Sequence, residues 1–321
     1  MNKINLVILI ILLSLPVAGS VKMPGRTIVP DSINARSFCV SPSQTHIFST
    51  RHNHVNIYEI ATGQKVFTYA NLTSSSIQSL ELTTDSSLLI AGTRDGELVI
   101  HDMHKAASSS VKLHDKMITS LAVDLQNDLI VAGDFEGALV FLNTTGHIKH
   151  VADVHQGVVT DLEIVDGEKI VVSSSFDGKI IKTNYKEQVL NSEVIFKKTP
   201  PSRAIAINNE ANRILTAYDN SWIYQFRISR ENQFDHFEKK RLSGWISSLS
   251  YSKRNKLVWA CATTDGKVRI YTTQGEYRLD TGKTINQIYL LETDESMLSV
   301  LVNMHDGGIC YIDANDMKLN M

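Results

Sequence analysis

The sequence has no excess of either charge, since 32 Lys and Arg residues stand against 34 Asp and Glu residues in a chain of 321. A nucleic-acid-binding surface needs a surplus of basic side chains, so this balance predicts no nucleic-acid partner. The basic cluster Lys239–Arg241 is too small to change that expectation. We expect it at the solvated end of a strand.

Cysteine is scarce, with three residues in the whole chain. Cys39, Cys261 and Cys310 lie far apart in the sequence, and no C-x-x-C pair or other metal-binding spacing is present. This excludes the common zinc and dithiol motifs. An odd number leaves at least one thiol unpaired within a monomer. We expect buried free thiols within strands, because free cysteine packs as a small hydrophobic residue.

The short motifs that mark common enzyme classes are also missing. The sequence contains no nucleophile elbow G-x-S-x-G, no phosphate-binding P-loop, no G-x-G-x-x-G and no H-E-x-x-H. Carboxylates occur mostly at turns, where aspartate has a structural role. We therefore expect a protein that is not an enzyme and that carries no cofactor. An enzyme or small-ligand binder that gathers residues from several repeats stays open as the alternative.

Long apolar runs are absent except at the N-terminus, where Leu6–Leu15 is apolar apart from Ser14. Lys3 precedes this run, Pro16 ends it, and small residues follow at Val17–Gly19. This order predicts a signal peptide over residues 1–19, because the run is shorter than the ~20 residues that a membrane span needs, and a retained anchor is the alternative. We expect an exported protein, in the periplasm or outside the cell, with no integral membrane segment after cleavage. The lumen of a eukaryotic secretory pathway is the alternative.

An apolar triplet at positions i, i+3 and i+5 recurs about every 40 residues. Each triplet is followed by an apolar run such as Leu129–Ala132, a tight turn such as Asp177-Gly178, and a further short strand. Asp-Gly suits a two-residue hairpin turn, because both central residues need positive φ. A fixed period with several strands per repeat predicts an all-β protein, a seven-bladed β-propeller of four-stranded antiparallel blades over residues 20–321. The seven triplets begin at Ala35, Ile77, Ile118, Val159, Ser202, Ile246 and Ile285.

Both ends of the chain are expected to take part in closing the ring. The last unit begins at Ile285 and ends with only a weak candidate strand at Met317–Leu319. The segment Arg26–Val29 has β-character and lies outside every repeat, so it is free to supply the missing outer strand. A closed ring leaves no open sheet edge between the first and last blades.

These repeats resemble those of the WD40 family. In that family a histidine precedes the first strand, a Ser or Thr lies in the second, an Asp follows in the turn, and Trp-Asp ends the third. His114 and His155 occupy the histidine position, and Ser173 and Asp177 match the next two positions in the fourth unit. The resemblance implies that His114 and His155 form hydrogen bonds between loop and strand. The Trp-Asp position is eroded in every unit, so no unit carries the complete set of four.

Histidines in two turns are the best lead to chemistry. His52 and His54 lie in the turn after the second strand of the first unit, and His305 and Asp306 lie in the same turn of the last unit. A closed ring makes these units neighbours. Imidazole and carboxylate groups suit a transition metal, so a metal site is one hypothesis. The simpler interpretation is that all four are solvated turn residues.

The same turns, with the loops that enter the first strands, are expected to share one face of the ring. Arginine and aromatic residues of the kind that protein interfaces favour occur there. In WD40 propellers this face is a frequent partner-binding surface, so the resemblance implies a protein partner. The residues that we expect on this face are Arg51, Arg94, Phe135, Phe176, Tyr218, Trp245, Thr264 and His305.

Together these features predict an exported, non-catalytic interaction scaffold whose partners are proteins. Exported propellers of this kind in bacteria often serve as accessory or assembly factors for envelope and redox enzymes, and the resemblance implies that role here. The alternative is a propeller enzyme, or a protein that binds a metal or small ligand, using the central channel and the histidine-bearing turns.

Overall fold

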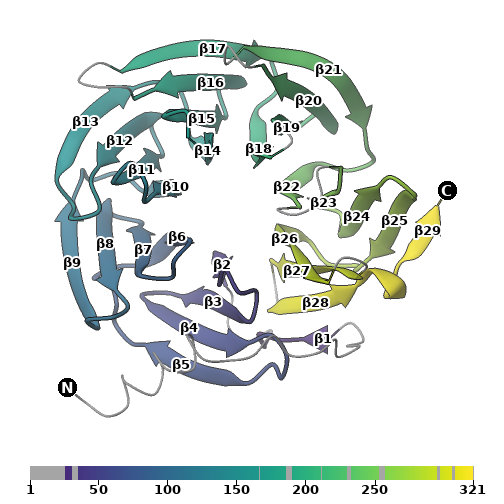
Figure 1. Ribbon diagram of the computed structural model, residues 1–321, viewed down its shortest axis with the longest axis horizontal. Coiled ribbons are helices and arrows are strands. Elements are labelled where there is room, and N and C mark those ends of the chain that lie inside the picture. The colour runs from purple at the N-terminus through teal and green to yellow at the C-terminus, as the bar shows by residue number, and fades with distance from the viewer. Residues whose placement is uncertain are drawn as a thin grey trace.

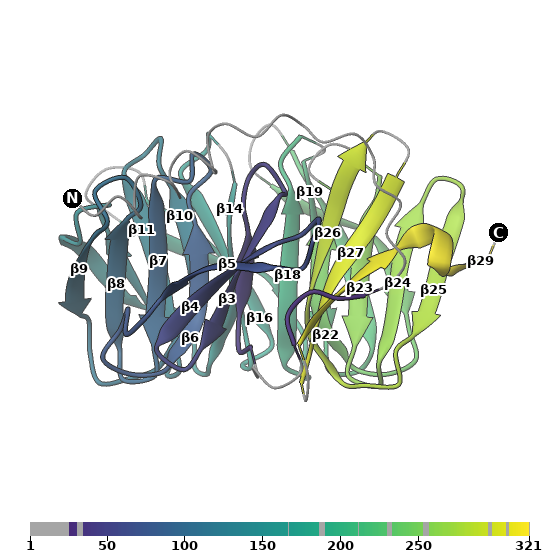
Figure 2. The same ribbon diagram turned by 90° about the horizontal axis from the view of Figure 1, so that it is seen from below.

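A computed structural model of the chain contains seven antiparallel sheets arranged around a central axis (Figure 1). The prediction of a seven-bladed propeller is confirmed. Seen edge-on, the ring is a disc with loops gathered at its two faces (Figure 2). The structure describes residues 26–30, 35–165, 167–185, 190–210, 212–229, 233–252, 257–294, 297–305 and 308–320. The predicted signal peptide, residues 1–19, lies outside these ranges.

The first four blades each contain four consecutive strands, ordered from the axis outward. Blade one contains β2 (Phe38–Val40), β3 (His46–Arg51), β4 (His54–Glu59) and β5 (Lys65–Tyr69). Blade two contains β6 (Ile77–Leu82), β7 (Leu88–Thr93), β8 (Glu97–Asp102) and β9 (Ala107–Lys112). Blade three contains β10 (Ile118–Asp124), β11 (Leu129–Asp134), β12 (Ala138–Leu142) and β13 (Ile148–Asp153). Blade four contains β14 (Val159–Val165), β15 (Ile170–Ser175), β16 (Lys179–Asn184) and β17 (Asn191–Lys197).

The last three blades complete the ring. Blade five contains β18 (Ser202–Asn208), β19 (Arg213–Tyr218), β20 (Trp222–Ile228) and β21 (Phe234–Arg241). Blade six contains β22 (Ile246–Tyr251), β23 (Trp259–Thr263), β24 (Lys267–Thr272) and β25 (Gly275–Asp280). Blade seven contains β26 (Ile285–Asp294), β27 (Met297–Met304), β28 (Ile309–Asp313) and the N-terminal β1 (Arg26–Thr27). A short 3-10 helix, η2 (Ala314–Asp316), precedes the last strand, β29 (Lys318–Asn320). Within the described part of the chain, no helix has the length and apolarity to cross a bilayer.

A β-bulge explains the unusual spacing of the apolar triplet. In blade three the pairing of β10 with β11 shifts between Ile118 and Ser120, and the other blades from two to seven show the same shift. The bulge adds one residue to the first strand. Side chains at i, i+3 and i+5 therefore point to the same side, and Ile118, Leu121 and Val123 pack in one apolar cluster.

The apolar core lies between blades, because each cluster combines residues of two neighbours. Phe48 and Ile57 of blade one, for example, pack with Leu80 and Leu89 of blade two. A single four-stranded sheet cannot cover its own faces, so each blade depends on the next. All three cysteines are free thiols in strands, as expected, although Cys310 is only partly buried.

The N-terminal segment closes the ring. Arg26 and Thr27 pair with Tyr311 and Cys310 of β28, so β1 is the outer strand of blade seven. The predicted role of this segment is confirmed. The candidate strand near the C-terminus forms as β29, but it pairs with β25 of blade six as a fifth strand. Blade seven cannot accept it, because β1 already occupies the outer position there.

Side chains on the innermost strands bridge neighbouring blades, whose described strands form separate sheets. Asp161 of β14 accepts a hydrogen bond from the backbone N–H of Ile205 at 3.0 Å. Gln287 of β26 both accepts from and donates to the backbone of Phe38, at 3.2 and 3.1 Å, and so links the last blade to the first. Burial raises the pKa of the Asp161 carboxyl to about 7, although its backbone donors oppose that rise.

The raised pKa of Asp161 predicts that the free energy of unfolding depends on pH. The folded state holds its proton up to about pH 7, whereas the unfolded chain releases it near pH ~4. Stability is therefore expected to fall as pH rises between these values, by up to about 1.4 kcal/mol per pH unit. Asp161→Asn removes this slope, which urea unfolding at pH 4.5, 6 and 7.5 measures. Asp115→Asn, whose side chain is 92% exposed, is the control and should keep it. An unchanged slope in Asp161→Asn would show that the carboxyl titrates normally.

Candidate partner-binding face

One face of the ring is fixed by a backbone hydrogen bond that six blades repeat. The residue that opens the turn between the second and third strands donates its N–H to the carbonyl of the loop entering the first strand, as Phe135 does to Met117 at 3.0 Å. The bond ties turn and loop together, so equivalent residues form a ring on one face. We call this the turn face. The six residues are Arg94, Phe135, Phe176, Asp219, Thr264 and His305.

Large apolar side chains are exposed on the turn face. Phe135 is 51% exposed, Phe176 is 40% exposed, and Trp245, in the loop entering blade six, is 57% exposed. Arg51, Arg94 and His305 are also exposed, whereas Thr264 is half-buried. Exposed aromatic rings beside arginines are typical of the anchors of protein interfaces.

The expectation that Tyr218 faces a partner is wrong. Tyr218 is fully buried at the end of β19, and its hydroxyl donates to the carbonyl of Gly178 at 3.3 Å. The next residue, Asp219, occupies the turn-face position. The turn of blade five has no Asp-Gly pair, so the residue equivalent to Phe135 was predicted one position too early.

Arg203, which is not among the residues expected from the sequence, also lies at the turn face. Its guanidinium lies 4.7 Å from the centre of the Phe176 ring, and its Nη2 donates to Asp219 Oδ2 at 3.0 Å. Arg203 therefore links Asp219 of its own blade five to the exposed Phe176 ring of blade four. At the same position, second in the first strand, blades three and four have Thr119 and Thr160, which donate to carbonyls of the next blade. An arginine at this position in blade five departs from that pattern, and this difference is visible in the sequence.

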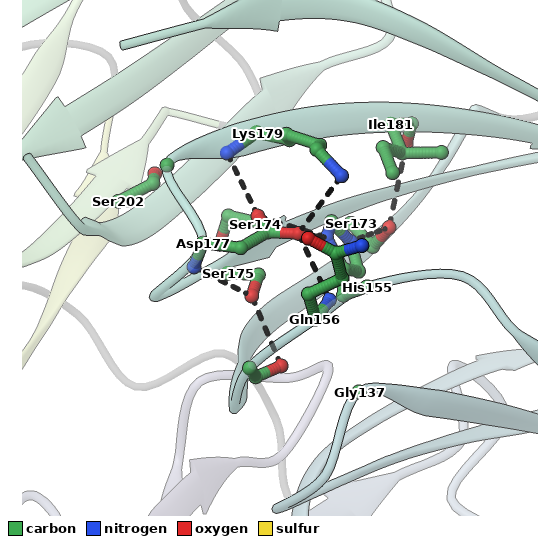
Figure 3. A network of polar contacts seen from close by, with 12 residues as sticks. Gly137, His155, Gln156, Ser173, Ser174, Ser175, Asp177, Lys179, Ile181 and Ser202 are labelled. Atoms are coloured by element: carbon green, nitrogen blue, oxygen red, sulfur yellow. Dashed lines mark hydrogen bonds and ion pairs between the residues drawn. The ribbon is translucent and has the colours of Figure 1, made fainter. Parts of the chain in front are cut away.

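His155, Ser173 and Asp177 come together inside blade four (Figure 3). His155 Nε2 lies 2.8 Å from Ser173 Oγ, and its Nδ1 lies 3.2 Å from the Asp177 carboxylate. The carboxylate also accepts from the backbone N–H groups of Gln156 and Lys179, at 3.0 and 2.9 Å. The network ties the loop before β14 to the turn between β15 and β16. The indole that completes the set in WD40 repeats has no counterpart here.

The electrostatics of this network favour a structural role. Burial lowers the pKa of His155, although the Asp177 carboxylate opposes this, so the ring is neutral near pH 7. Burial opposes ionisation of Asp177, but hydrogen bonds, first from the backbone of Gln156 and Lys179, hold its pKa below the usual value. A serine, a histidine and an aspartate in a row suggest a catalytic triad. Ser173 is 0% exposed, however, so a substrate cannot reach its hydroxyl in this conformation.

His114 makes a different set of contacts. Its Nδ1 accepts from the backbone N–H of Lys116 at 3.1 Å, and its Nε2 lies 3.4 Å from Asp134 Oδ2. Asp134 ends β11 and accepts backbone hydrogen bonds from Glu136 and Gly137 in the following turn. In blade three the acidic partner of the histidine is therefore Asp134, at the end of a strand, whereas in blade four it is Asp177, in the turn.

Among the residues that the structure describes, the histidine-bearing turns do not bring together a set of metal ligands. His54 Nδ1 accepts from the backbone N–H of Asn71 at 2.8 Å, and His52 has a left-handed backbone with φ of 52°. His305 is exposed and Asp306 lies outside the described residues. Where the structure describes the chain, no three His, Cys, Asp or Glu side chains are placed to hold a metal ion. The metal hypothesis stays a prediction without structural support.

A small cavity of about 220 Å³ lies between blades three and four, where the strands end away from the turn face. Its lining includes Phe141, His150 and Tyr185. These residues belong to the outer half of the blades, so the cavity is not the central-channel site of the alternative prediction.

Comparison with known proteins bears on the fold alone. No protein-family model matches the chain, and no curated protein matches it either. Among solved structures, the chain is similar to U3-55K, with a TM-score of 0.76 and 15% identity over 90% of this chain and 98% of the other. It is similar to the RRP9 WD40 repeats, with a TM-score of 0.76 and 14% identity over 92% and 98% of the two chains. A chain of the mitotic checkpoint complex gives a TM-score of 0.73 and 14% identity over 92% and 99%. The protein therefore has the seven-bladed fold of the WD40-repeat propellers, as its repeats predicted.

Proposed function

We propose that this protein is a non-catalytic interaction scaffold that binds a protein partner through the turn face. The observation that carries the proposal is the exposure of Phe135, Phe176 and Trp245, at 51%, 40% and 57%, on one side of a rigid ring. Rings of this size have a large apolar area to bury and few rotamers to lose on binding. One neighbour with the same fold is a chain of the mitotic checkpoint complex, and this supports the proposal by analogy of fold.

The test is loss of a partner on removing the exposed rings. Phe135→Ser and Trp245→Ser together are expected to weaken partner binding at least about thirtyfold, since anchor residues each contribute about 2 kcal/mol or more and about 1.4 kcal/mol is a factor of ten. The partner is first captured from the native source with the wild-type chain and then titrated. Val66→Ser with Val151→Ser is the matched control, because these residues are 42% and 62% exposed on outer strands. Equal binding of the partner by both double variants would contradict the proposal.

The proposed site of action is outside the cytoplasm, with a role as accessory or assembly factor for an envelope or redox enzyme. The N-terminal sequence supports export, through the apolar run Leu6–Leu15 and the small residues that follow. The mass of the protein isolated from its native source is expected to match a chain that begins near residue 20. A mass that includes residues 1–19 would count against a cleaved signal peptide.

A further inference from the structure

Three cations on the outer rim of blades four and five are held by aromatic rings. Lys198 Nζ lies 5.1 Å from the centre of the Phe196 ring and 5.5 Å from that of Tyr224. Lys239 Nζ lies 5.1 Å from the Trp222 ring, and the Arg241 guanidinium lies 6.0 Å from the same ring. We call Lys198, Trp222, Lys239 and Arg241 the cationic patch.

These three cations contact aromatic rings, whereas cations elsewhere in the molecule form ion pairs. Lys105, Lys116 and Lys267 each form an ion pair with an aspartate or glutamate. Within the described ranges, no carboxylate lies within 4.0 Å of the charged nitrogens of Lys198, Lys239 or Arg241. Charge-to-ring attraction is worth only about 0.5–1 kcal/mol at exposed sites, so an arriving carboxylate can compete for these cations.

The strand geometry sets a spacing for the ligand. Arg241 and Lys239 of β21 pair in register with Trp222 and Tyr224 of β20, so the two cations project to the same side of the blade. Residues two apart on a strand are about 6.6–6.8 Å apart. An extended peptide with carboxylates at alternate positions has the same repeat. Lys198, on the neighbouring blade, can meet a further carboxylate.

The patch adjoins the turn face. Trp222 opens β20 directly after the turn that begins at Asp219, and its backbone N–H donates to Asn220 Oδ1 of that turn at 3.4 Å. Both Lys239 and Arg241 are exposed. A partner seated on Phe176 and Arg203 can therefore extend a segment outward over the patch.

We propose that the cationic patch binds an acidic, extended segment of the partner, with carboxylates at alternate positions. The inference rests on the proposed function, because it gives the chemistry of the partner that the turn face holds. A peptide fits better than a nucleic acid, since the chain as a whole carries a formal net charge of −2. The aromatic surface beneath the cations supplies apolar contact for the methylene groups of glutamate side chains.

The experiment uses the full chain and a fluorescently labelled hexapeptide in which serine and glutamate alternate. Anisotropy is expected to show saturable binding that weakens as salt rises, because the pairing is electrostatic. Lys239→Gln with Arg241→Gln is expected to weaken it about tenfold, the effect of losing two exposed charge pairs. Lys65→Gln with Lys149→Gln, which removes two charges from other outer strands, should bind as the wild type does. Thermal unfolding checks that both double variants are folded.

Several outcomes would overturn the inference. Equal binding of the glutamate peptide by both double variants would show that the patch is not its site. Equal binding of a peptide with lysine in place of glutamate would exclude charge recognition, and tighter binding of a single-stranded oligonucleotide would point to another class of ligand. If the patch variant holds the captured partner normally while Phe135→Ser with Trp245→Ser loses it, the inference fails and the proposed function stands. If neither double variant loses the partner, the proposed function fails.

Discussion

Gly308→Ala is expected to displace the N-terminal segment from blade seven and to open the ring. A Cβ atom on Gly308 would overlap the carbonyl oxygen of Val29, which is a backbone atom and can move only if the segment moves with it. That oxygen accepts the N–H of Ile309 at 3.1 Å, so the clash falls on the bond that holds the segment. Ile28 and Val29 are 2% and 0% exposed and would lose their core contacts.

The expected loss is about 3 to 6 kcal/mol in the free energy of unfolding, from exposing two aliphatic side chains at about 1.5–3 kcal/mol each. Urea unfolding measures it, and limited proteolysis should cut the segment before residue 35. Gly157→Ala is the matched control, because the nearest atom to its new Cβ is 3.4 Å away. Equal unfolding midpoints for the two variants would contradict closure by the N-terminal segment.

His155→Ala is expected to destabilise the protein by about 3 kcal/mol. The side chain is 0% exposed, so its removal leaves a cavity and takes away the nearer of two hydrogen-bond partners of the buried Ser173 hydroxyl, the other being the Ile181 carbonyl at 3.4 Å. Asp177 keeps its backbone donors and is not left alone. His104→Ala, at an exposed turn, is the control and should change stability by less than about 0.5 kcal/mol.

The pH dependence separates this role from simple packing. The folded-state pKa of His155 is lowered below the model-peptide value of about 6.5. The contribution of His155 to the free energy of unfolding is therefore complete above that pH. It is lost as pH falls, because the unfolded chain binds a proton that the buried ring does not. The difference between wild type and His155→Ala should narrow below about pH 6.5. A difference that stays constant from pH 8 to pH 5 would contradict the neutral, buried ring.

The architecture could be predicted from the sequence because the repeat is a consequence of packing. Ile77, Ile118 and Val159 recur at equal steps because each fills the same place between two blades, beside the same β-bulge. Closure by Arg26–Val29 was predictable for a similar reason, since one outer strand was missing. The pairing of β29 with blade six was not, because nothing in Lys318–Asn320 says which open edge it meets.

The functional surface was only partly predictable. Phe135 and Phe176 stand at regular positions, so the repeat placed them on the turn face. Tyr218 was misplaced by one residue, because the turn of blade five departs from the repeat. The cationic patch could not be predicted, since Lys198 meets Tyr224 only where blade four contacts blade five, and Lys239 meets Trp222 only through the pairing of β21 with β20. Sequence shows a basic run at Lys239–Arg241 but not the rings that hold it.

The most direct test of the scaffold proposal is site-specific photo-crosslinking in the native source. A photoreactive residue at position 135, on the turn face, is compared with one at position 66, on the outer strand β5, since both native side chains are exposed. We predict that position 135 gives a discrete crosslinked protein product and that position 66 gives none. A discrete product at position 66 with none at position 135 would contradict partner binding through the turn face.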